Sequence, residues 1–168
     1  TMPDKLILTE KRNPDTENLD VMSSLEIAQA MNNEDKKVAL AVEKVLPQIA
    51  QAIDSIVNAF QANGRLAYFG AGTSGRLGVL DASECPPTFG ANPDIVQAFI
   101  AGGNQAIRQA VENAEDRIEL AQQDIAAFAP TKHDVVVAIS ASGNPNYCLE
   151  ALRLPHLAGA KTISVSSN

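Results

Sequence analysis

Two short loops of the sequence combine glycine with hydroxyl side chains. The first covers residues 70–76 and the second covers residues 140–144, and each follows a short apolar run typical of a buried strand. Glycine lets the backbone approach an anion closely, the amides at the start of a following helix are unpaired, and hydroxyl groups add further donors. We therefore predict that the two loops together bind a phosphate group. The residues assigned to this binding are Gly72, Thr73, Ser74, Gly75, Ser140, Ser142, Gly143 and Asn144.

The first loop also fits the pattern G-x-G-x-x-G, which is typical of dinucleotide-binding proteins. Such a site needs an acidic residue about 20 positions further on, at the end of the second strand. The expected second strand, residues 95–100, is followed by Ala101 and two glycines, and Asp94 falls before it. A nucleotide-dependent oxidoreductase and a tight turn without a ligand are alternatives, but the second loop favours a small phosphorylated ligand.

Two acidic segments could supply proton transfer. Glu84 precedes Cys85 and two prolines, and its helix follows the first loop, so we predict that Glu84 reaches the bound ligand. Ser83 beside it is assigned to the same binding site. On its own, a glutamate at a helix end is more often a solvated surface residue. Glu115 lies in an acidic stretch in which Glu119 follows one helical turn later, and the pattern alone singles out neither residue.

The remaining residue types with catalytic or ligand chemistry show no such arrangement. His133 and His156 have no partners at metal-ligand spacing, and Cys85 and Cys148 lie far apart in the chain. We therefore expect no metal site, a structural role for Cys85, and a reducing, cytoplasmic environment.

The amino-terminal part of the chain is predicted to be helical after a polar arm. Residues 1–20 are polar and contain two prolines, so we expect an arm without its own core. Residues 21–63 form a helical segment that begins with a capping box at residues 23–26. We expect a break at Asn32 and Asn33, and either a kink or two abutting helices at Pro47.

Residues 64–168 form a domain in which short strands alternate with helices. Strands are expected at residues 65–69, 95–100, 135–139 and 162–165. Helices are expected at residues 77–83, 104–128 and 145–158, with Pro86 and Pro87 stopping the first. This alternation predicts an α/β fold with a parallel sheet covered by helices on both faces, and the two loops should meet at its carboxyl edge. Because the chain stops just after the fourth strand, we expect a fragment.

The composition limits the classes of partner. The chain of 168 residues has 13 Lys and Arg against 20 Asp and Glu, which gives a formal net charge of −7. This balance argues against a broad basic surface for nucleic acid or an anionic membrane. No apolar run approaches the roughly 20 residues that cross a bilayer. We expect a soluble protein that holds its anionic ligand with local donors.

Several motifs extend the pattern beyond the two loops. They cover residues 33–36, 41–47, 70–78, 80–88, 101–103 and 110–116, and residues 84–87 are Glu-Cys-Pro-Pro. In these motifs the chain resembles the N-acetylmuramic acid 6-phosphate etherase family. The resemblance implies the SIS (sugar isomerase) domain, a flavodoxin-like three-layer αβα sandwich with a parallel sheet, here preceded by N-terminal helices. It also implies a cytoplasmic homodimer that acts on an amino-sugar phosphate without a cofactor.

The resemblance also assigns the two catalytic glutamates of the family to Glu84 and Glu115. The implied activity is cleavage of the ether between D-lactate and C3 of the sugar, which gives N-acetylglucosamine 6-phosphate. A base removes the C2 proton of the open-chain sugar, an acid protonates the leaving alkoxide, and water then adds to the unsaturated intermediate. We assign the acid to Glu84 and the base to Glu115.

One departure from the family and one alternative function accompany this assignment. Several relatives continue the second loop with Arg-Thr-Pro, whereas this chain has Asn144, Pro145 and Asn146 and so lacks that arginine. The alternative is a regulatory protein of the same fold that binds phosphorylated sugars without turnover. The presence of both glutamates favours the enzyme.

Overall fold

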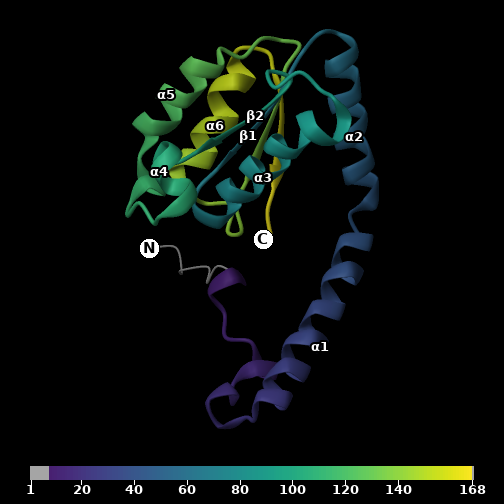
Figure 1. Cartoon of the computed structure of the whole chain (residues 1–168), viewed down its shortest axis with the longest axis vertical. Helices are drawn as coiled ribbons and strands as arrows, with labels where there is room; N and C mark the ends of the chain where they lie inside the picture. Colours follow the sequence, from purple (N-terminus) through teal and green to yellow (C-terminus); the bar gives the residue numbers. More distant parts are fainter. Residues whose placement is uncertain (1–7, 168) are drawn as a thin grey trace, which may run out of the picture. The chain divides into compact units, whose positions relative to one another are not determined.

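The computed structural model describes residues 8–167, and the chain divides into two compact units between Ile53 and Asp54. The first unit contains three single-turn 3-10 helices, η1 (Leu8–Glu10), η2 (Pro14–Thr16) and η3 (Leu19–Val21), none with a buried residue. Helix α1 (Ser24–Glu43) follows, and α2 (Leu46–Gln61) begins in this unit and ends in the second (Figure 1).

The start of α1 is the predicted capping box. The Ser23 hydroxyl accepts a hydrogen bond from the Glu26 amide, and the Glu26 carboxylate accepts one from the Ser23 amide at 2.7 Å. The predicted break at Asn32 and Asn33 is wrong, because α1 runs through both residues. Asparagine in a helix interior costs less than about 0.7 kcal/mol relative to alanine, which a helix of 20 residues tolerates. Pro47 lies in the first turn of α2, so the expectation of two abutting helices is confirmed.

The second unit is built on a parallel sheet of four strands, all of which the sequence predicts to within a residue or two. The strands are β1 (Leu66–Gly70), β2 (Val96–Ile100), β3 (Val135–Ile139) and β4 (Lys161–Val165). Their order is β2-β1-β3-β4, the arrangement that begins a flavodoxin-like sheet. Gly70 pairs with both Ile100 and Ile139, so the loops after β1, β2 and β3 leave the sheet at the same edge.

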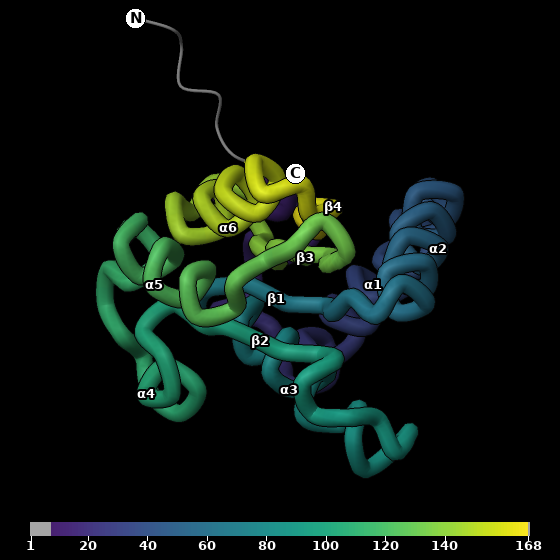
Figure 2. The backbone as a smooth tube through the Cα atoms, turned by 90° about the horizontal axis from the view of Figure 1, so that it is seen from above, coloured from purple at the N-terminus to yellow at the C-terminus, as the bar shows by residue number. Residues whose placement is uncertain are grey.

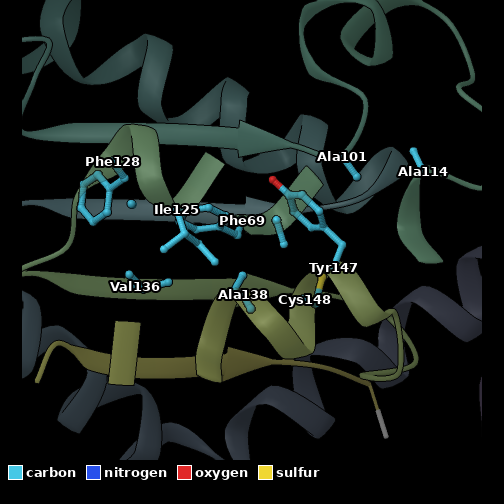
Figure 3. Close-up of a cluster of buried hydrophobic side chains, with 12 residues drawn as sticks. Phe69, Ala101, Ala114, Ile125, Phe128, Val136, Ala138, Tyr147 and Cys148 are labelled. Atoms are coloured by element: carbon cyan, nitrogen blue, oxygen red, sulfur yellow. The ribbon is translucent and has the colours of Figure 1, made fainter. Parts of the chain in front are cut away.

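Helices cover both faces of this sheet, as Figure 2 shows with α3 on one side and α5 and α6 on the other. Phe69 and Val136 face a core cluster that includes residues of α5 (Ile118–Phe128) and α6 (Asn146–Leu157). The Phe69 ring stacks on Phe99 at 4.8 Å, and Tyr147 of α6 lies beside it (Figure 3). Side chains of α2 and of α3 (Gly72–Phe89) pack on the opposite face. The predicted three-layer α/β architecture is confirmed.

Two helix predictions in this unit are wrong. Helix α3 begins at Gly72 and continues through Pro86 and Pro87 to Phe89. A proline in the last turns of a helix loses a hydrogen bond but keeps a helical φ, and the actual stop is Gly90 in the left-handed conformation. The helix expected at residues 104–128 is divided into α4 (Gly103–Arg108), η4 (Ala114–Asp116) and α5.

Candidate active site

The first glycine-rich loop forms the junction between β1 and α3. Gly72 has a φ of 54°, a conformation in which glycine is favoured, and this turn directs the chain from the sheet into the helix. Ala71 is the N-cap and makes no side-chain capping bond. The first amides of a helix have no intrahelical acceptor, so the start of α3 presents donors suited to an anion.

A cavity of about 270 Å³ opens at the start of α3. One wall comes from Gly72, Thr73 and Arg76, and the other comes from residues 109–115, which include Glu112 and Glu115. The structure therefore brings the predicted residues Gly72, Thr73 and Glu115 to one cavity. A cavity lined by the start of a helix and by a carboxylate can hold an anion beside a proton acceptor.

Glu115 lies on η4, in the short turn between α4 and α5, and its side chain is exposed. Its charge acts on Cys148 of α6. Burial raises the pKa of the Cys148 thiol to about 11, a hydrogen bond with the Ala71 backbone lowers it in part, and the charge of Glu115 raises it further. Glu115 therefore lies close to the point where the first loop meets α6, and Cys148 is a protonated thiol near neutral pH.

Glu84 lies elsewhere on this chain. It is exposed in the second half of α3, twelve residues after Gly72, which corresponds to roughly 18 Å along a helix. It is absent from the lining of the cavity that contains Glu115. Ser83 beside it donates its hydroxyl to the Leu80 carbonyl at 2.8 Å within the same helix. Within the described residues, the structure does not bring Glu84 and Ser83 to Glu115.

Cys85 follows Glu84 on the inner side of α3 and packs against the core. Burial raises the pKa of its thiol, and the nearby charge of Asp81 acts in the same direction. A thiol held in this form is a weak nucleophile, which agrees with the structural role expected from the sequence.

The second loop is folded on itself at the end of β3. The hydroxyl of buried Ser140 accepts a hydrogen bond from the Gly143 amide at 3.1 Å, and the Ser142 hydroxyl accepts one from the Asn144 amide at 3.2 Å. Gly143 has a φ of 76°. None of these residues lines the 270 Å³ cavity, although the loop leaves the same edge of the sheet. Their role in substrate binding stays a prediction.

Two other predicted residues, Ser74 and Gly75, lie in the first turn of α3 but not on the cavity wall. A Cβ atom at Gly75 would lie 2.7 Å from the Gly70 carbonyl oxygen and 2.6 Å from Ile100 Cγ1. Gly75 therefore allows α3 to pack closely on β1 and β2. This packing accounts for the glycine independently of any ligand.

Sequence reasoning missed Arg76, Glu112 and Asn113 as cavity residues. Arg76 follows Gly72 by four positions, so both residues lie on one side of α3, and that spacing was an available signal. Residues 109–113 were expected to be helical. Asn113 has a φ of 58°, and asparagine is among the few residues that adopt this conformation readily, so it was a second signal.

Two further kinds of feature, a metal-binding group of side chains and a membrane-spanning helix, are absent from the described residues. Within residues 8–167, no three side chains of His, Cys, Asp or Glu are grouped so that they could hold a metal ion. No helix in this range combines the length and the apolar character that a bilayer span requires.

Comparison with known proteins agrees with the fold. A family model described as the glucokinase regulatory protein N-terminal SIS domain matches residues 48–155. The chain belongs to the SIS-domain family. Two solved SIS-like structures, phosphoheptose isomerases from Neisseria gonorrhoeae and Francisella tularensis, each superpose with a TM-score of 0.68. These structures are 20% and 22% identical in sequence to this chain. Each superposition covers 86% of this chain and 75% of the isomerase chain, which shows a shared fold.

Curated relatives of this SIS-domain chain are much more similar in sequence. It is 56% identical over 162 residues to the N-acetylmuramic acid 6-phosphate etherase of Glaesserella parasuis serovar 5, and 55% identical to N-acetylmuramic acid 6-phosphate etherase 2 of Vibrio parahaemolyticus. Both matches cover 96% of the chain but only 53% and 54% of the relatives. The resemblance found in the motifs is confirmed, and the chain spans about half the length of these relatives.

Proposed function

We propose that this chain provides the sugar-phosphate-binding half of an N-acetylmuramic acid 6-phosphate etherase. The observation that carries the proposal is the cavity that joins the first turn of α3 to Glu115. The reaction requires an anion site for the 6-phosphate and a base near C2 of the sugar, and these two features supply both. The similarity to curated etherases over 96% of the chain supports the same activity.

The proposed chemistry begins with the open-chain sugar. Glu115 removes the C2 proton, the electron pair forms the C2–C3 double bond, and the C3–O bond to lactate breaks. Glu84 donates a proton to the departing lactate oxygen. Water then adds at C3 while a proton returns to C2, which gives N-acetylglucosamine 6-phosphate and D-lactate. The two carboxyl groups exchange roles between the elimination and the addition.

Substrate binding follows from the start of α3. Gly72 and Thr73 line the cavity, and we propose that their amides bind the phosphate together with the hydroxyl of Ser74 in the same turn. Ligand sites usually enclose about 300–1,000 Å³, so a cavity of about 270 Å³ supports a site to which other parts contribute. The second loop and Glu84 are the contributors that we propose.

A homodimer explains how Glu84 reaches the site. Leu77, Leu80 and Glu84 follow one another at helical spacing on α3, and both leucines are more than half exposed. These two leucines give this face of α3 apolar area that a protein partner can cover. We propose that a second copy packs on this face, and that Glu84 of each copy completes the cavity of the other.

Subunit mixing tests this arrangement. Glu84→Gln and Glu115→Gln variants of the complete protein should each be inactive alone. If each site combines Glu115 of one subunit with Glu84 of the other, random mixing of the two inactive variants should restore about a quarter of the wild-type rate. A mixture that stays inactive while the subunits exchange would mean that both glutamates of a site come from one chain.

The second candidate is a binding protein that regulates through sugar phosphates without turnover. The family model that matches this chain carries the name of a regulatory protein, and this observation favours the second candidate. The two functions separate in one assay, in which the complete protein is incubated with N-acetylmuramic acid 6-phosphate and D-lactate is measured. Lactate release identifies the etherase, whereas saturable binding without lactate identifies the regulator. For the etherase we propose a cytoplasmic location, where a phosphorylated sugar is retained.

A further inference from the structure

The segment that carries Glu115 has little regular structure of its own. Residues 109–117 connect α4 to α5, and their only helical part is the single turn η4. Asn113 precedes this turn with a φ of 58°, and Glu115 itself is exposed. A side chain on such a segment keeps a fixed position only if other elements hold the segment on both sides.

Arg76 of α3 holds the first side. Its Nε donates to the Ile107 carbonyl at 3.0 Å, and its Nη2 donates to the Gln109 carbonyl at 3.4 Å. These carbonyls belong to the end of α4, where helix carbonyls lack intrahelical partners and carry partial negative charge. A guanidinium group with several donors in a fixed plane can bond both at once. Arg76 therefore ties the start of the Glu115 segment to the first turn of α3.

Asn146 of α6 holds the other side. Its Nδ2 donates to the Asp116 carbonyl at 3.3 Å, immediately after Glu115. Between the two anchors, Ala114 is 3% exposed and belongs to the core. Val111 packs against Gly102, where an added Cβ would lie 3.0 Å from the Val111 Cβ. The backbone is thus fixed before and after Glu115, while its carboxylate stays free of the core.

We infer that Arg76 and Asn146 are positioning residues that hold Glu115 against the phosphate-binding turn of α3. This inference rests on the proposed role of Glu115 as the base. Arg76 lies near the start of α3, where we propose that phosphate binds. Asn146 lies at the start of α6, the helix that follows the second loop. Helix α3, which begins at the first loop, and helix α6, which follows the second loop, are therefore both bonded to the segment that carries Glu115, and these bonds restrict the distance between the proposed phosphate site and the proton acceptor.

The experiment compares Arg76→Met with Arg76→Gln in the complete protein, using N-acetylmuramic acid 6-phosphate and lactate release. Both variants remove the charge, but glutamine retains an N–H donor for one carbonyl and methionine retains none. A base displaced by about 1 Å can lose on the order of 10²-fold in rate. We expect Arg76→Met to lower kcat about 10–10²-fold with KM changed less than about threefold, and Arg76→Gln to retain more of kcat.

Arg108→Met is the matched control, because it removes an exposed positive charge from the last turn of the same α4 helix. It should leave kcat unchanged. Asn146→Ala should lower kcat by a smaller factor than Arg76→Met, and since Asn146 is exposed it keeps the inference testable if Arg76→Met does not fold. Melting temperatures show that the compared variants are folded.

Three results would overturn the inference. Equal increases in KM for Arg76→Met and Arg76→Gln, with kcat unchanged, would make Arg76 a direct ligand of the substrate. Wild-type kcat in both folded Arg76→Met and Asn146→Ala, beside an inactive Glu115→Gln, would remove the positioning role but leave the proposed function intact. A fully active Glu115→Gln would instead overturn the proposed base itself.

Discussion

The parallel sheet has an amino edge, where its strands begin, and a carboxyl edge, where they end. Charged side chains at these two edges differ in burial and in hydrogen bonding. At the amino edge, the Asp134 side chain is 2% exposed and accepts hydrogen bonds from the amides of Arg65 and Thr131, both at 2.8 Å. The Arg65 guanidinium adds an ion pair at 2.8 Å and lies 4.2 Å from the Phe128 ring centre. At the carboxyl edge, Glu112 and Glu115 are exposed and form no ion pair among the described residues.

We propose that this difference separates residues that stabilise the fold from residues that act on a substrate. A buried carboxylate whose oxygens are all bonded fixes the structure around it, and it has no capacity left for a ligand. A carboxylate and helix amides that face a cavity contribute little to folding and can bind and transfer protons. Changes at the amino edge should therefore affect unfolding, and changes at the carboxyl edge should affect turnover.

The largest effect should come from Glu115→Gln at the carboxyl edge. General acid–base catalysis by a positioned side chain contributes about 10²–10⁴-fold, so kcat should fall by that factor while the melting temperature stays unchanged. Glu119→Gln is the matched control, because Glu119 lies in the same acidic stretch but outside the cavity. Equal losses of lactate release in both variants would show that the cavity does not distinguish the two glutamates.

The amino edge should give the next largest effect, in stability. Asp134→Ala leaves the amides of Arg65 and Thr131 without their acceptor, and each buried donor left unsatisfied costs about 1–3 kcal/mol in the free energy of unfolding. Denaturant titration measures this loss, with Asp94→Ala as an exposed control that should stay within about 0.5 kcal/mol. The folded fraction of Asp134→Ala should keep its kcat. A normal stability would contradict the assigned division between the edges.

Substrate binding at the carboxyl edge should show intermediate effects. We propose the Ser74 and Ser142 hydroxyls as donors to the phosphate, and Ser74→Ala and Ser142→Ala each remove one of them. A hydrogen bond to a charged group contributes about 1.5–3 kcal/mol. The effect should appear mainly in KM, since the phosphate is held alike in the ground state and the transition state. An unchanged KM in both variants would mean that the phosphate binds elsewhere.

The smallest effect should be a pH dependence at the amino edge. Burial alone would raise the pKa of the Asp134 carboxyl, but hydrogen bonds from Arg65 and Thr131 outweigh it and hold the pKa below the ordinary value. The stabilisation is therefore complete above the unfolded-state pKa of about 3.9 and is lost as the pH falls through the lower folded-state pKa. Below about pH 4, the stability of Asp134→Asn should fall less steeply with falling pH than that of the wild type. Parallel curves would contradict this.

The elements of the sheet could be predicted from the sequence because their signals are local. The β-branched run at residues 135–139 and the glycines after residue 69 determine a strand and a tight turn by themselves. The division of the helix expected at residues 104–128 could not be predicted with the same ease. Arg76 and Asn146 bond the intervening segment from helices distant in sequence, and such tertiary contacts leave no periodic pattern.

Individual residues of the candidate site could be predicted from the sequence, but their arrangement in space could not. Gly72, Thr73 and Glu115 were chosen from motifs, and the structure brings them to one cavity. Glu84 is predicted beside the loop because its helix follows the loop and two prolines come directly after it. Since α3 runs unbroken from Gly72 to Phe89, the helix rise carries Glu84 away from the cavity of its own chain.

The most direct test of the proposed reaction is the fate of solvent isotopes in the complete protein. We expect that, in ¹⁸O-labelled water, the label enters the amino-sugar phosphate at C3 and is absent from lactate, because elimination breaks the C3–O bond. In D₂O, deuterium should appear at C2 of the product, and Glu115→Gln should lose C2 exchange together with turnover. Label in the lactate would show that water attacks the lactyl carbon. The proposed elimination mechanism would then be wrong.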